Sequence, residues 1–465
     1  MPGDETTFPA ADVVVVTVPF VAQGHLTQLL RLSHIISSYN IPVHFITTPT
    51  CIRQVVSRHR LSTAATHHIH FHEIPVRPFT TPPPHPTTPF PTHLQPSFDS
   101  TLHLRHPTTN LILSLSQKVN RVVVIHDVLM SYVVQDVKSI PNAETYLFQP
   151  PPPFYRSSSH WEKSGGPFPL EPELMNNLPS RDGISSPEFL KFLSLQQSHI
   201  NFHIGELYDS SRIIEAKFIE YLEKEDTVGK KKIWAVGPLN PVQIATNATD
   251  SMSRHECLQW LDKQVTNSVL YVSFGTTTTF SDEQIRELAL GLERSGERFV
   301  WVVRVGDTGG SCGFEGRTVE LPEGFEERLC GRGLILRSWA PQLEILEHFA
   351  TGGFMSHCGW NSCMESISMG VPMATWPMHS DQPRNAFFIT NVLKIGIVVK
   401  NWERRNELVT ADVVAEVVKR LMGSEEGAEM RRRAGELGGE VRESVAEGGV
   451  SRMEMDSFIS YVSRS

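Results

Sequence analysis

The sequence predicts an α/β protein of two domains, because of its length and its alternating apolar segments. The chain has 465 residues, which exceeds the size at which one hydrophobic core keeps growing. In each half, short apolar runs alternate with segments whose apolar residues recur at helical spacing. This alternation is typical of parallel sheets covered by helices, and two such units leave a cleft between them in which ligands bind.

The first half opens with VVVVTV at 13–18, which predicts a buried strand. After a Gly-containing turn, a helix is expected whose apolar face is formed by Leu26, Leu29, Leu30, Ile35 and Ile36. Further strands are expected at 43–47, 69–74 and 122–126.

Two proline-rich segments, 77–96 and 149–161, interrupt this pattern. Proline fixes φ and lacks a backbone N–H, so we expect both segments to form long loops. The first segment either lines an apolar pocket or forms an excursion on the surface, and both alternatives stay open.

The strand and helix alternation restarts after a charged, Gly-, Pro-, Asn- and Ser-rich stretch at 224–253, which indicates an interdomain linker. The second half then predicts a helix from Ser281 and strands at 268–274, 299–304 and 334–337. We therefore expect a first domain at 1–240 and a second at 241–449. A terminal helix at about 450–465 is able to pack back on the first domain.

Composition excludes several classes of protein. The net charge of −9 and the pI near 6.1 argue against a nucleic-acid binder, which needs clustered Lys and Arg. The polar, acidic start does not resemble a secretory leader, and no apolar run approaches the roughly 20 residues that span a bilayer, so a cytoplasmic protein without a membrane partner is expected. The six cysteines include no Cys-x-x-Cys pair, which favours free thiols over disulfides or a zinc site.

The stretch from Trp339 to Gln382 carries more polar and aromatic chemistry than a core segment needs. A tryptophan directly after a strand can stack on a base, and Gln342 can hydrogen-bond a ribose or a base edge. Gly359 leads into a predicted helix, whose first N–H groups favour a diphosphate. Glu365 lies four residues after Asn361, on the same helical face, where its carboxylate can accept both ribose hydroxyls.

Each of these residues has an ordinary structural alternative. Taken alone, Trp339 is more often a half-buried core residue, His357 a structural histidine and Glu365 a solvated charge. Asn361 and Ser362 commonly serve as helix caps. The spacing of the whole set is what favours a nucleotide-sugar site.

The same stretch resembles the signature box of the plant secondary-product, or family 1, UDP-glycosyltransferases, with matches at Trp339, Gln342, 357–362, Glu365 and the final Asp381 and Gln382. The resemblance implies a GT-B fold of two facing Rossmann-like domains, with UDP-sugar held by the second. Thr276, in SFGTTTT, resembles a phosphate-contacting hydroxyl, although it can equally end a strand. The implied donor-binding set is Gly24, Thr276, Trp339, Ala340, Gln342, His357, Gly359, Trp360, Asn361, Ser362, Glu365, Asp381 and Gln382.

A base is needed to take the proton of the acceptor hydroxyl. His25 fits because it lies between the first strand and the first helix, at the sheet edge where ligands bind. Asp127 ends a later strand at the same edge and can stabilise the imidazolium, and the pair resembles the family's His-Asp dyad. His126 is a competitor, but a one-residue step along a strand reverses the side-chain direction.

The resemblance implies an inverting transfer of glucose from UDP-glucose to a small plant metabolite, by a monomer. No Asp-x-Asp pair occurs, which favours a mechanism without a metal or other cofactor. Gln28 and His126 look most like the zeatin O-glucosyltransferase subgroup, so the acceptor is expected to be a cytokinin hydroxyl or a flavonoid or other phenol. Xylosyl transfer and C-glycosylation on a flavonoid-type acceptor remain alternatives.

Other functions fit less well. A dehydrogenase needs Gly-x-Gly-x-x-Gly after its first strand, which VPFVAQGHLTQ lacks. The GGSCG at 309–313 matches an esterase motif, but no helix is predicted after Ser311. The histidines at 67, 68, 70 and 72 could hold a metal, but their alternation with apolar residues favours one polar face of a strand.

Overall fold

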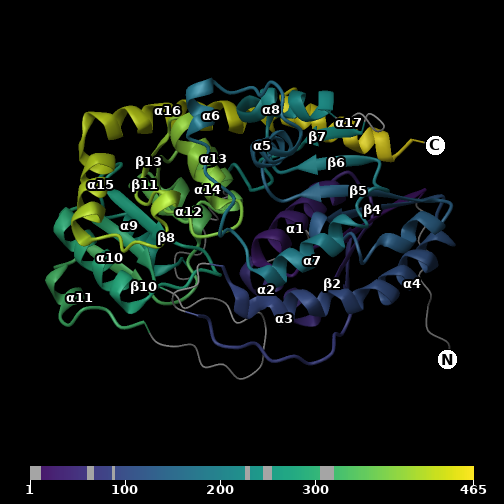
Figure 1. The fold of residues 1–465 in the computed structure, drawn as a ribbon, viewed down its shortest axis with the longest axis horizontal. Helices are drawn as coiled ribbons and strands as arrows, with labels where there is room; N and C mark the ends of the chain where they lie inside the picture. The colour runs from purple at the N-terminus through teal and green to yellow at the C-terminus, as the bar shows by residue number, and fades with distance from the viewer. Residues whose placement is uncertain are drawn as a thin grey trace.

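The chain forms two lobes, each with its own parallel sheet (Figure 1). The computed structural model describes residues 12–59, 68–85, 90–225, 231–243, 254–303 and 319–464. Ser311 and half of the expected linker, 226–230 and 244–253, lie outside these ranges. Within them, no helix is both long and apolar enough to cross a membrane. No disulfide joins the cysteines of the described residues.

The first sheet has seven parallel strands in the order β3-β2-β1-β4-β5-β6-β7. The predicted strands at 13–18, 43–47, 69–74 and 122–126 are all present, with small differences in their ends. The strands are β1 (Val13–Val18), β2 (Val43–Thr47), β3 (Ile69–Glu73), β4 (Arg121–Asp127), β5 (Ala143–Gln149), β6 (Gly205–Tyr208) and β7 (Lys232–Ala235).

The second sheet repeats this plan with six parallel strands in the order β10-β9-β8-β11-β12-β13. Its strands are β8 (Val269–Ser273), β9 (Arg298–Val302), β10 (Gly333–Leu336), β11 (Thr351–Ser356), β12 (Met373–Thr375) and β13 (Gly396–Val398). In both sheets the strand order reverses once, between β1 and β4 and between β8 and β11. Ligands of such sheets bind at the carboxyl ends of the strands beside this reversal.

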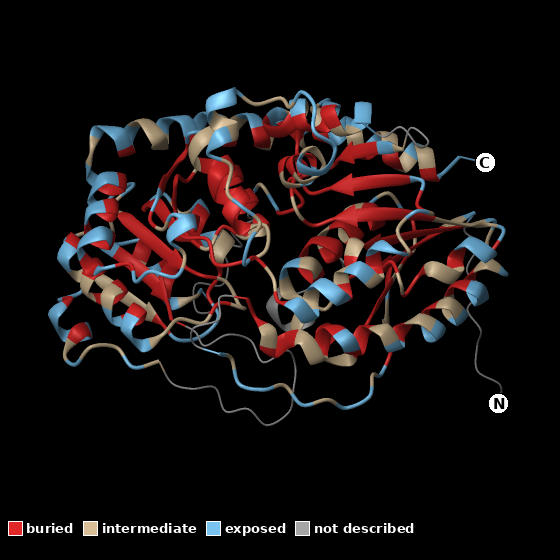
Figure 2. Cartoon of the chain, in the orientation of Figure 1, coloured by how far each residue is buried: buried red, intermediate tan, exposed pale blue. Residues whose placement is uncertain are grey.

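Helices cover both sheets and bury their apolar sides against them (Figure 2). In the first lobe they are α1 (Gln23–Ser37), α2 (Pro49–His59), α3 (Gln95–Ser100), α4 (Arg105–Ser116), α5 (Pro153–Ser164), α6 (Pro172–Asn176), α7 (Pro187–Gln197) and α8 (Arg212–Glu225). The later helices are α9 (Glu256–Leu261), α10 (Asp282–Ser295), α11 (Phe325–Arg328), α12 (Gln342–Glu347), α13 (Trp360–Met369), α14 (Gln382–Phe387), α15 (Ala411–Gly423), α16 (Glu425–Ser444) and α17 (Val450–Val462).

Local sequence explains where the helices begin. Ser281 caps the predicted helix α10, because its hydroxyl accepts a hydrogen bond from the backbone N–H of Gln284. Gly296 ends the same helix in the left-handed conformation that glycine adopts without strain. On α1, four of the five predicted core residues are buried and Ile35 is only partly buried.

One sequence-based expectation is wrong. The second proline-rich segment is not a long loop, because its later part forms helix α5. Pro153 occupies the first turn of this helix, where a proline costs little because that N–H has no partner within the helix. In the first segment, α3 begins at Gln95, near the predicted end of the loop.

The last helix returns to the first lobe, as Figure 1 shows for α17 beside β7. The ring of Phe458 lies edge-on to Trp234, with 5.2 Å between centroids, and it also packs against Tyr146. Helix α16 joins the second lobe to this contact. The boundary at 240/241 stays a prediction; β7 ends at Ala235 and β8 begins at Val269.

Candidate active site

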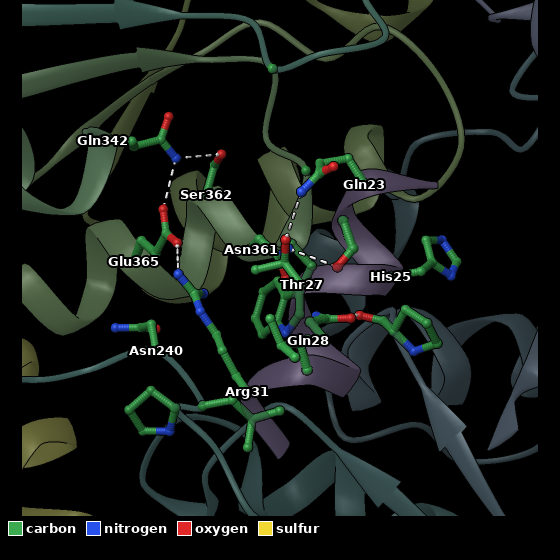
Figure 3. A pocket seen from close by; sticks show the side chains of 18 of the residues that line it. Gln23, His25, Thr27, Gln28, Arg31, Asn240, Gln342, Asn361, Ser362 and Glu365 are labelled. Carbon is green, nitrogen blue, oxygen red and sulfur yellow. Dashed lines mark hydrogen bonds and ion pairs between the residues drawn. The ribbon is translucent and has the colours of Figure 1, made fainter. Parts of the chain in front are cut away.

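A cavity of about 1120 Å³ lies between the two lobes and is lined by residues from the strand ends of both sheets. The segment after β1 and the start of α1 form one wall. The segments after β8, β10 and β11 and the start of α13 form the opposite wall (Figure 3). Because the strand order of each sheet reverses at β1/β4 and β8/β11, both ligand-binding edges open into one cleft.

His25, in the first turn of α1, lines this cleft, and Asp127, at the end of β4, is buried behind it. The imidazole Nδ1 of His25 lies 2.6 Å from the carboxylate Oδ2 of Asp127, and the aspartate side chain is fully buried. The other oxygen of Asp127 accepts a hydrogen bond from the backbone N–H of Leu129, which holds the carboxylate in place. Burial lowers the pKa of His25, but the charge and hydrogen bond of Asp127 more than offset this effect, so the pKa is raised.

His126 points away from the cleft, as its position on the strand predicts. Its ring stacks on Phe202 and its Nδ1 bonds to the carbonyl of Asp127. Burial lowers the pKa of His126 to about 3, so this histidine is neutral. It is not a competitor for the base.

The base-stacking candidate lies at the rim of the cleft. Trp339 follows β10 and is 38% exposed, which leaves a ring face open to a ligand. The neighbouring Ala340 is buried and also lines the cavity. An exposed indole beside a cavity is suited to stacking on a nucleobase.

The diphosphate candidates surround the start of α13. Gly359 precedes the helix, and His357, Asn361 and Ser362 line the cavity beside it. Burial lowers the pKa of His357 to about 4, so its imidazole is neutral, and its Nδ1 has no partner. The first N–H groups of a helix are suited to phosphate oxygens.

Two glycines allow His357 to lie where it does. A Cβ added to Gly275 would stand 2.7 Å from Nε2 of His357, and one added to Gly359 would stand 2.6 Å from the same atom. Gly275 also has a φ of +73°, which favours glycine. Thr276 follows it and lines the cavity, as expected from the sequence.

Glu365 has a partner that the sequence did not predict. Its Oε1 lies 2.7 Å from Nη2 of Arg31, on helix α1 of the other lobe. Its Oε2 accepts a hydrogen bond of 2.8 Å from Nε2 of Gln342 (Figure 3). Arg31 and its partner are 334 positions apart, and no local pattern in the sequence marks this pairing.

The residues expected to bind the sugar lie at the opposite end of the box. Burial raises the pKa of Asp381, whose Oδ2 accepts a hydrogen bond from Nδ2 of Asn385. Gln382 also lines the cavity; its Oε1 accepts from the backbone N–H groups of Met378 and His379, and its amide nitrogen lies 3.5 Å from Nε2 of His379. Trp360 is nearly buried, and its indole N–H donates to the carbonyl of Asp209, so that N–H is already engaged.

The acceptor side is lined by aromatic rings that the sequence did not single out. The Phe20 ring lies edge-on to His25, with 5.3 Å between centroids. Phe90 packs at 5.0 Å against Phe189 and at 5.6 Å, edge-on, against His379. These rings come from separate segments of the chain. In the sequence analysis only the first proline-rich segment, which contains Phe90, was considered as a lining for an apolar pocket.

The histidines on β2 and β3 stack on one another, while His67 lies outside the described residues. His70 and His72 share one face of β3, as predicted, and each ring stacks on His44 at about 5 Å. Burial and the neighbouring histidines lower the pKa of His44 to about 3. Among the described residues, no group of three or more His, Cys, Asp and Glu side chains has an arrangement that could hold a metal ion.

Comparison with known proteins identifies the family of the chain. The family model described as the N-terminal domain of glycosyltransferases matches residues 11–241, and that described as UDP-glucoronosyl and UDP-glucosyl transferase matches residues 238–425. The chain is 51% identical over 454 residues to zeatin O-glucosyltransferase of Phaseolus lunatus, covering 97% of each chain. It is 50% identical over 453 residues to zeatin O-xylosyltransferase of Phaseolus vulgaris, covering 97% of this chain and 98% of the other.

Solved structures give the same result for the fold. UGT2 of Phytolacca americana, complexed with UDP-2-fluoro-glucose and pterostilbene, aligns with a TM-score of 0.73 at 27% identity, covering 98% of this chain and all of the other. A glycosyltransferase of Siraitia grosvenorii in complex with UDP aligns with a TM-score of 0.75 at 28% identity, covering 97% of this chain and 100% of the other. The predicted GT-B fold and the predicted use of a UDP-sugar and a small-molecule acceptor are confirmed. The chain belongs to the family of UDP-glucoronosyl and UDP-glucosyl transferases, and it is a UDP-glycosyltransferase.

Proposed function

We propose that this enzyme transfers glucose from UDP-glucose to the side-chain hydroxyl of a cytokinin such as zeatin, with inversion and without a metal. The observation that carries the proposal is that His25, held by the buried Asp127, lines the same cavity as the UDP-sugar residues. The similarity to two zeatin glycosyltransferases supports the choice of acceptor. Flavonoids and other phenols are the alternative acceptors.

His25 is the proposed general base. Its Nδ1 is bound to Asp127, so Nε2 is the nitrogen left to take the proton of the acceptor hydroxyl. The hydroxyl oxygen then attacks the anomeric carbon, the bond from that carbon to the UDP oxygen breaks, and UDP leaves with the electron pair. Attack from the side opposite to UDP gives the β-linked product from an α-linked donor.

The donor wall holds the leaving group and the sugar. We assign uracil to Trp339 and Ala340, the ribose to Gln342 and Glu365, and the diphosphate to Thr276, His357, Asn361 and Ser362, beside the backbone of Gly24 and Gly359. Asp381, Gln382 and Trp360 would hold the sugar. Neutral N–H donors fixed around the diphosphate stabilise the charge that develops as UDP leaves, which lowers the barrier of the reaction.

The aromatic acceptor wall supports a flat, apolar acceptor. Phe20, Phe90 and Phe189 offer ring faces and edges beside the base, which suits a purine or a phenolic ring. A phenol acceptor with an activated ring carbon would allow C-glycosylation at the same site. Xylose differs from glucose by one hydroxymethyl group, and discrimination of that size is about 1–3 kcal/mol.

Product analysis tests the proposal. The purified chain is incubated with trans-zeatin and either UDP-glucose or UDP-xylose, and the products are fragmented in a mass spectrometer. Loss of an intact hexose, with UDP-glucose preferred, is expected. N6-isopentenyladenine is the matched control, because it has the same ring system and no side-chain hydroxyl. Equal reaction of both purines, or cross-ring fragments from a phenol, would contradict the proposal.

We also propose that the enzyme acts as a cytoplasmic monomer without a nucleic-acid partner. The net charge of −9 supports the last point, because a phosphate backbone repels an acidic surface. One cavity receives residues from both lobes of the same chain, so a second copy is not needed to complete it. Light scattering of the purified protein at two concentrations would show a dimer if one forms.

A further inference from the structure

Arg31 connects the two walls of the cleft. It lies on α1, six residues after His25, which corresponds to about 9 Å along the helix axis. Its guanidinium reaches across the cleft to Glu365 of α13, with Nη2 2.7 Å from Oε1 (Figure 3). The two side chains are only 14% and 8% exposed, so water screens this ion pair weakly.

The carboxylate of Glu365 keeps room for a ligand while it binds Arg31. An ionised carboxylate has about four acceptor positions, and Arg31 and Gln342 each use one, on different oxygens. The amide of Gln342 is itself held by a second hydrogen bond, of 3.0 Å, to the hydroxyl of Ser362. The carboxylate is therefore fixed in orientation and still able to accept two neighbouring hydroxyl groups.

A second bond joins the same two helices. Nδ2 of Asn361, one turn before Glu365 on α13, donates to the carbonyl oxygen of Gly24 at 2.9 Å. Gly24 and Arg31 are seven residues apart and thus share one side of α1. His25 lies between these two attachment points. Both side chains of α13 that hold α1 are side chains that we assign to the donor.

We infer that Arg31 is a positioning residue that couples donor binding to the placement of the base. A ribose that occupies the two remaining positions of Glu365 fixes this carboxylate, the carboxylate fixes Arg31, and Arg31 fixes the helix that carries His25. The inference rests on the proposed assignment of Glu365 to the donor ribose. A purely structural role for the Arg31–Glu365 ion pair would only hold the two lobes together. The coupling that we infer requires more: the change in UDP affinity caused by replacing Arg31 must depend on whether Glu365 is present.

A double-mutant cycle on UDP binding tests this requirement. The Kd for UDP is measured by titration calorimetry for the native chain, R31M, E365Q and the double variant. We expect R31M to weaken UDP binding about tenfold in the native chain, because it leaves a buried carboxylate without its cation. In the E365Q background the same change should alter the Kd by less than about twofold. An equal loss in both backgrounds, or no loss in either, overturns the inference.

Coupling to the acceptor is the second measurement. The Kd for trans-zeatin is measured with and without saturating UDP, and we expect the gain from UDP in the native chain to disappear in R31M and to return in part in R31K, which keeps the charge. R452M is the matched control: Arg452 also lines the cavity, but its ion pair is with Asp456 on its own helix. Unchanged coupling in R31M contradicts the inference.

Two controls keep these results interpretable. A thermal unfolding curve shows whether R31M folds, and R31K carries the test if it does not. If zeatin does not bind at all, the proposed acceptor is wrong, but the cycle with UDP alone still decides the role of Arg31.

Discussion

The two walls of the cleft both present histidines, and the pKa values of these histidines shift in opposite directions. On the first wall, the buried Asp127 raises the pKa of His25 against the effect of burial. On the second wall, burial lowers the pKa of His357 to about 4 and, together with His357, that of His379 to about 3. A histidine on the first wall thus has the raised pKa that suits a base, whereas the histidines on the second wall are neutral hydrogen-bonding groups.

The position of a carboxylate explains this difference. Asp127 ends β4, next to β1, so the reversal of strand order in the first sheet brings a charge to His25. At the equivalent place in the second sheet, β11 ends at Ser356 and glycines surround His357. A neutral imidazole there avoids placing a titrating cation beside the diphosphate. This difference supports the proposed division, in which the first wall moves a proton and the second wall binds the leaving group.

The largest effect is expected when the proposed base on the first wall, His25, is removed. We expect His25→Ala to lower kcat by about 10³-fold, within the range of general-base catalysis, because the proposed base that Asp127 holds in place is lost. The Kd for UDP should stay within about twofold, since the donor wall is intact. Initial rates and calorimetry on the same preparation measure both quantities.

His126→Phe is the matched control for this variant. Phenylalanine keeps the stack on Phe202 and points away from the cleft, so a loss of less than about tenfold is expected. A large loss of UDP affinity in His25→Ala would contradict the separate roles of the two walls.

Removal of the charge at Asp127 should have a smaller effect and a characteristic pH dependence. The unprotonated form of His25 is the active form, so the rate falls as the pH drops below the pKa of His25, which is raised above 6.5 in the native chain. In Asp127→Asn, the charge that chiefly offsets the effect of burial is lost and only the smaller effect of Asp381 remains, so the pKa of His25 falls. We expect the acid limb of kcat/KM to move to lower pH, while the maximum rate falls about a hundredfold because a weaker base abstracts the proton.

The pH profile distinguishes the loss of the Asp127 charge from a disturbed structure of the site. Asparagine keeps the size and one hydrogen-bonding oxygen of the aspartate, so a general loss of structure would lower the rate without moving the acid limb. An acid limb that stays in place, or moves to higher pH, would show that Asp127 does not set the pKa of His25.

On the second wall, the exposed ring of Trp339 gives the next largest effect. Stacking on a base contributes about 1–3 kcal/mol, so Trp339→Ala should raise the Kd for UDP roughly 5- to 150-fold. The change in kcat at saturating UDP-glucose should be small, because the ring is assigned to the uracil and not to the reacting atoms. Trp339→Phe keeps a stacking face and should recover part of the affinity. A fall in kcat with an unchanged Kd would place Trp339 elsewhere in the reaction.

The two walls also differ in how well the sequence predicted them. Most donor residues lie in one stretch of 44 positions that covers β11, α13 and β12, so their spacing alone indicated a shared site. The approach of His25 to Asp127 followed from a general property of parallel sheets, whose strand ends meet at one edge. Strand periodicity likewise predicted four of the seven strands of the first sheet, β1 to β4.

What the sequence did not predict depends on contacts between distant segments. Arg31 meets Glu365 across the cleft, and nothing in the composition of α1 distinguishes this arginine from a solvated one. Helix α5 was expected to be a loop, because prolines were counted without regard to their place in the first helical turn. The aromatic acceptor wall is assembled from separate segments, so no single motif marks it.

The smallest expected effect comes from a change in the aromatic acceptor wall, and it should alter the KM for the acceptor alone. The Phe90 ring is buried between Phe189 and His379, and it lines the cavity beside the base. Phe90→Leu keeps apolar bulk and loses the ring contacts, which contribute about 0.5–1.5 kcal/mol per aromatic pair, so the KM for zeatin should rise about two- to tenfold. The KM for UDP-glucose should not change, since Phe90 lies on the acceptor side. An equal rise in both KM values would mean that the variant disturbs His379 and also Gln382, which accepts a hydrogen bond from the backbone N–H of His379. The two walls would then depend on each other, contrary to the division of roles that the pKa shifts of their histidines indicate.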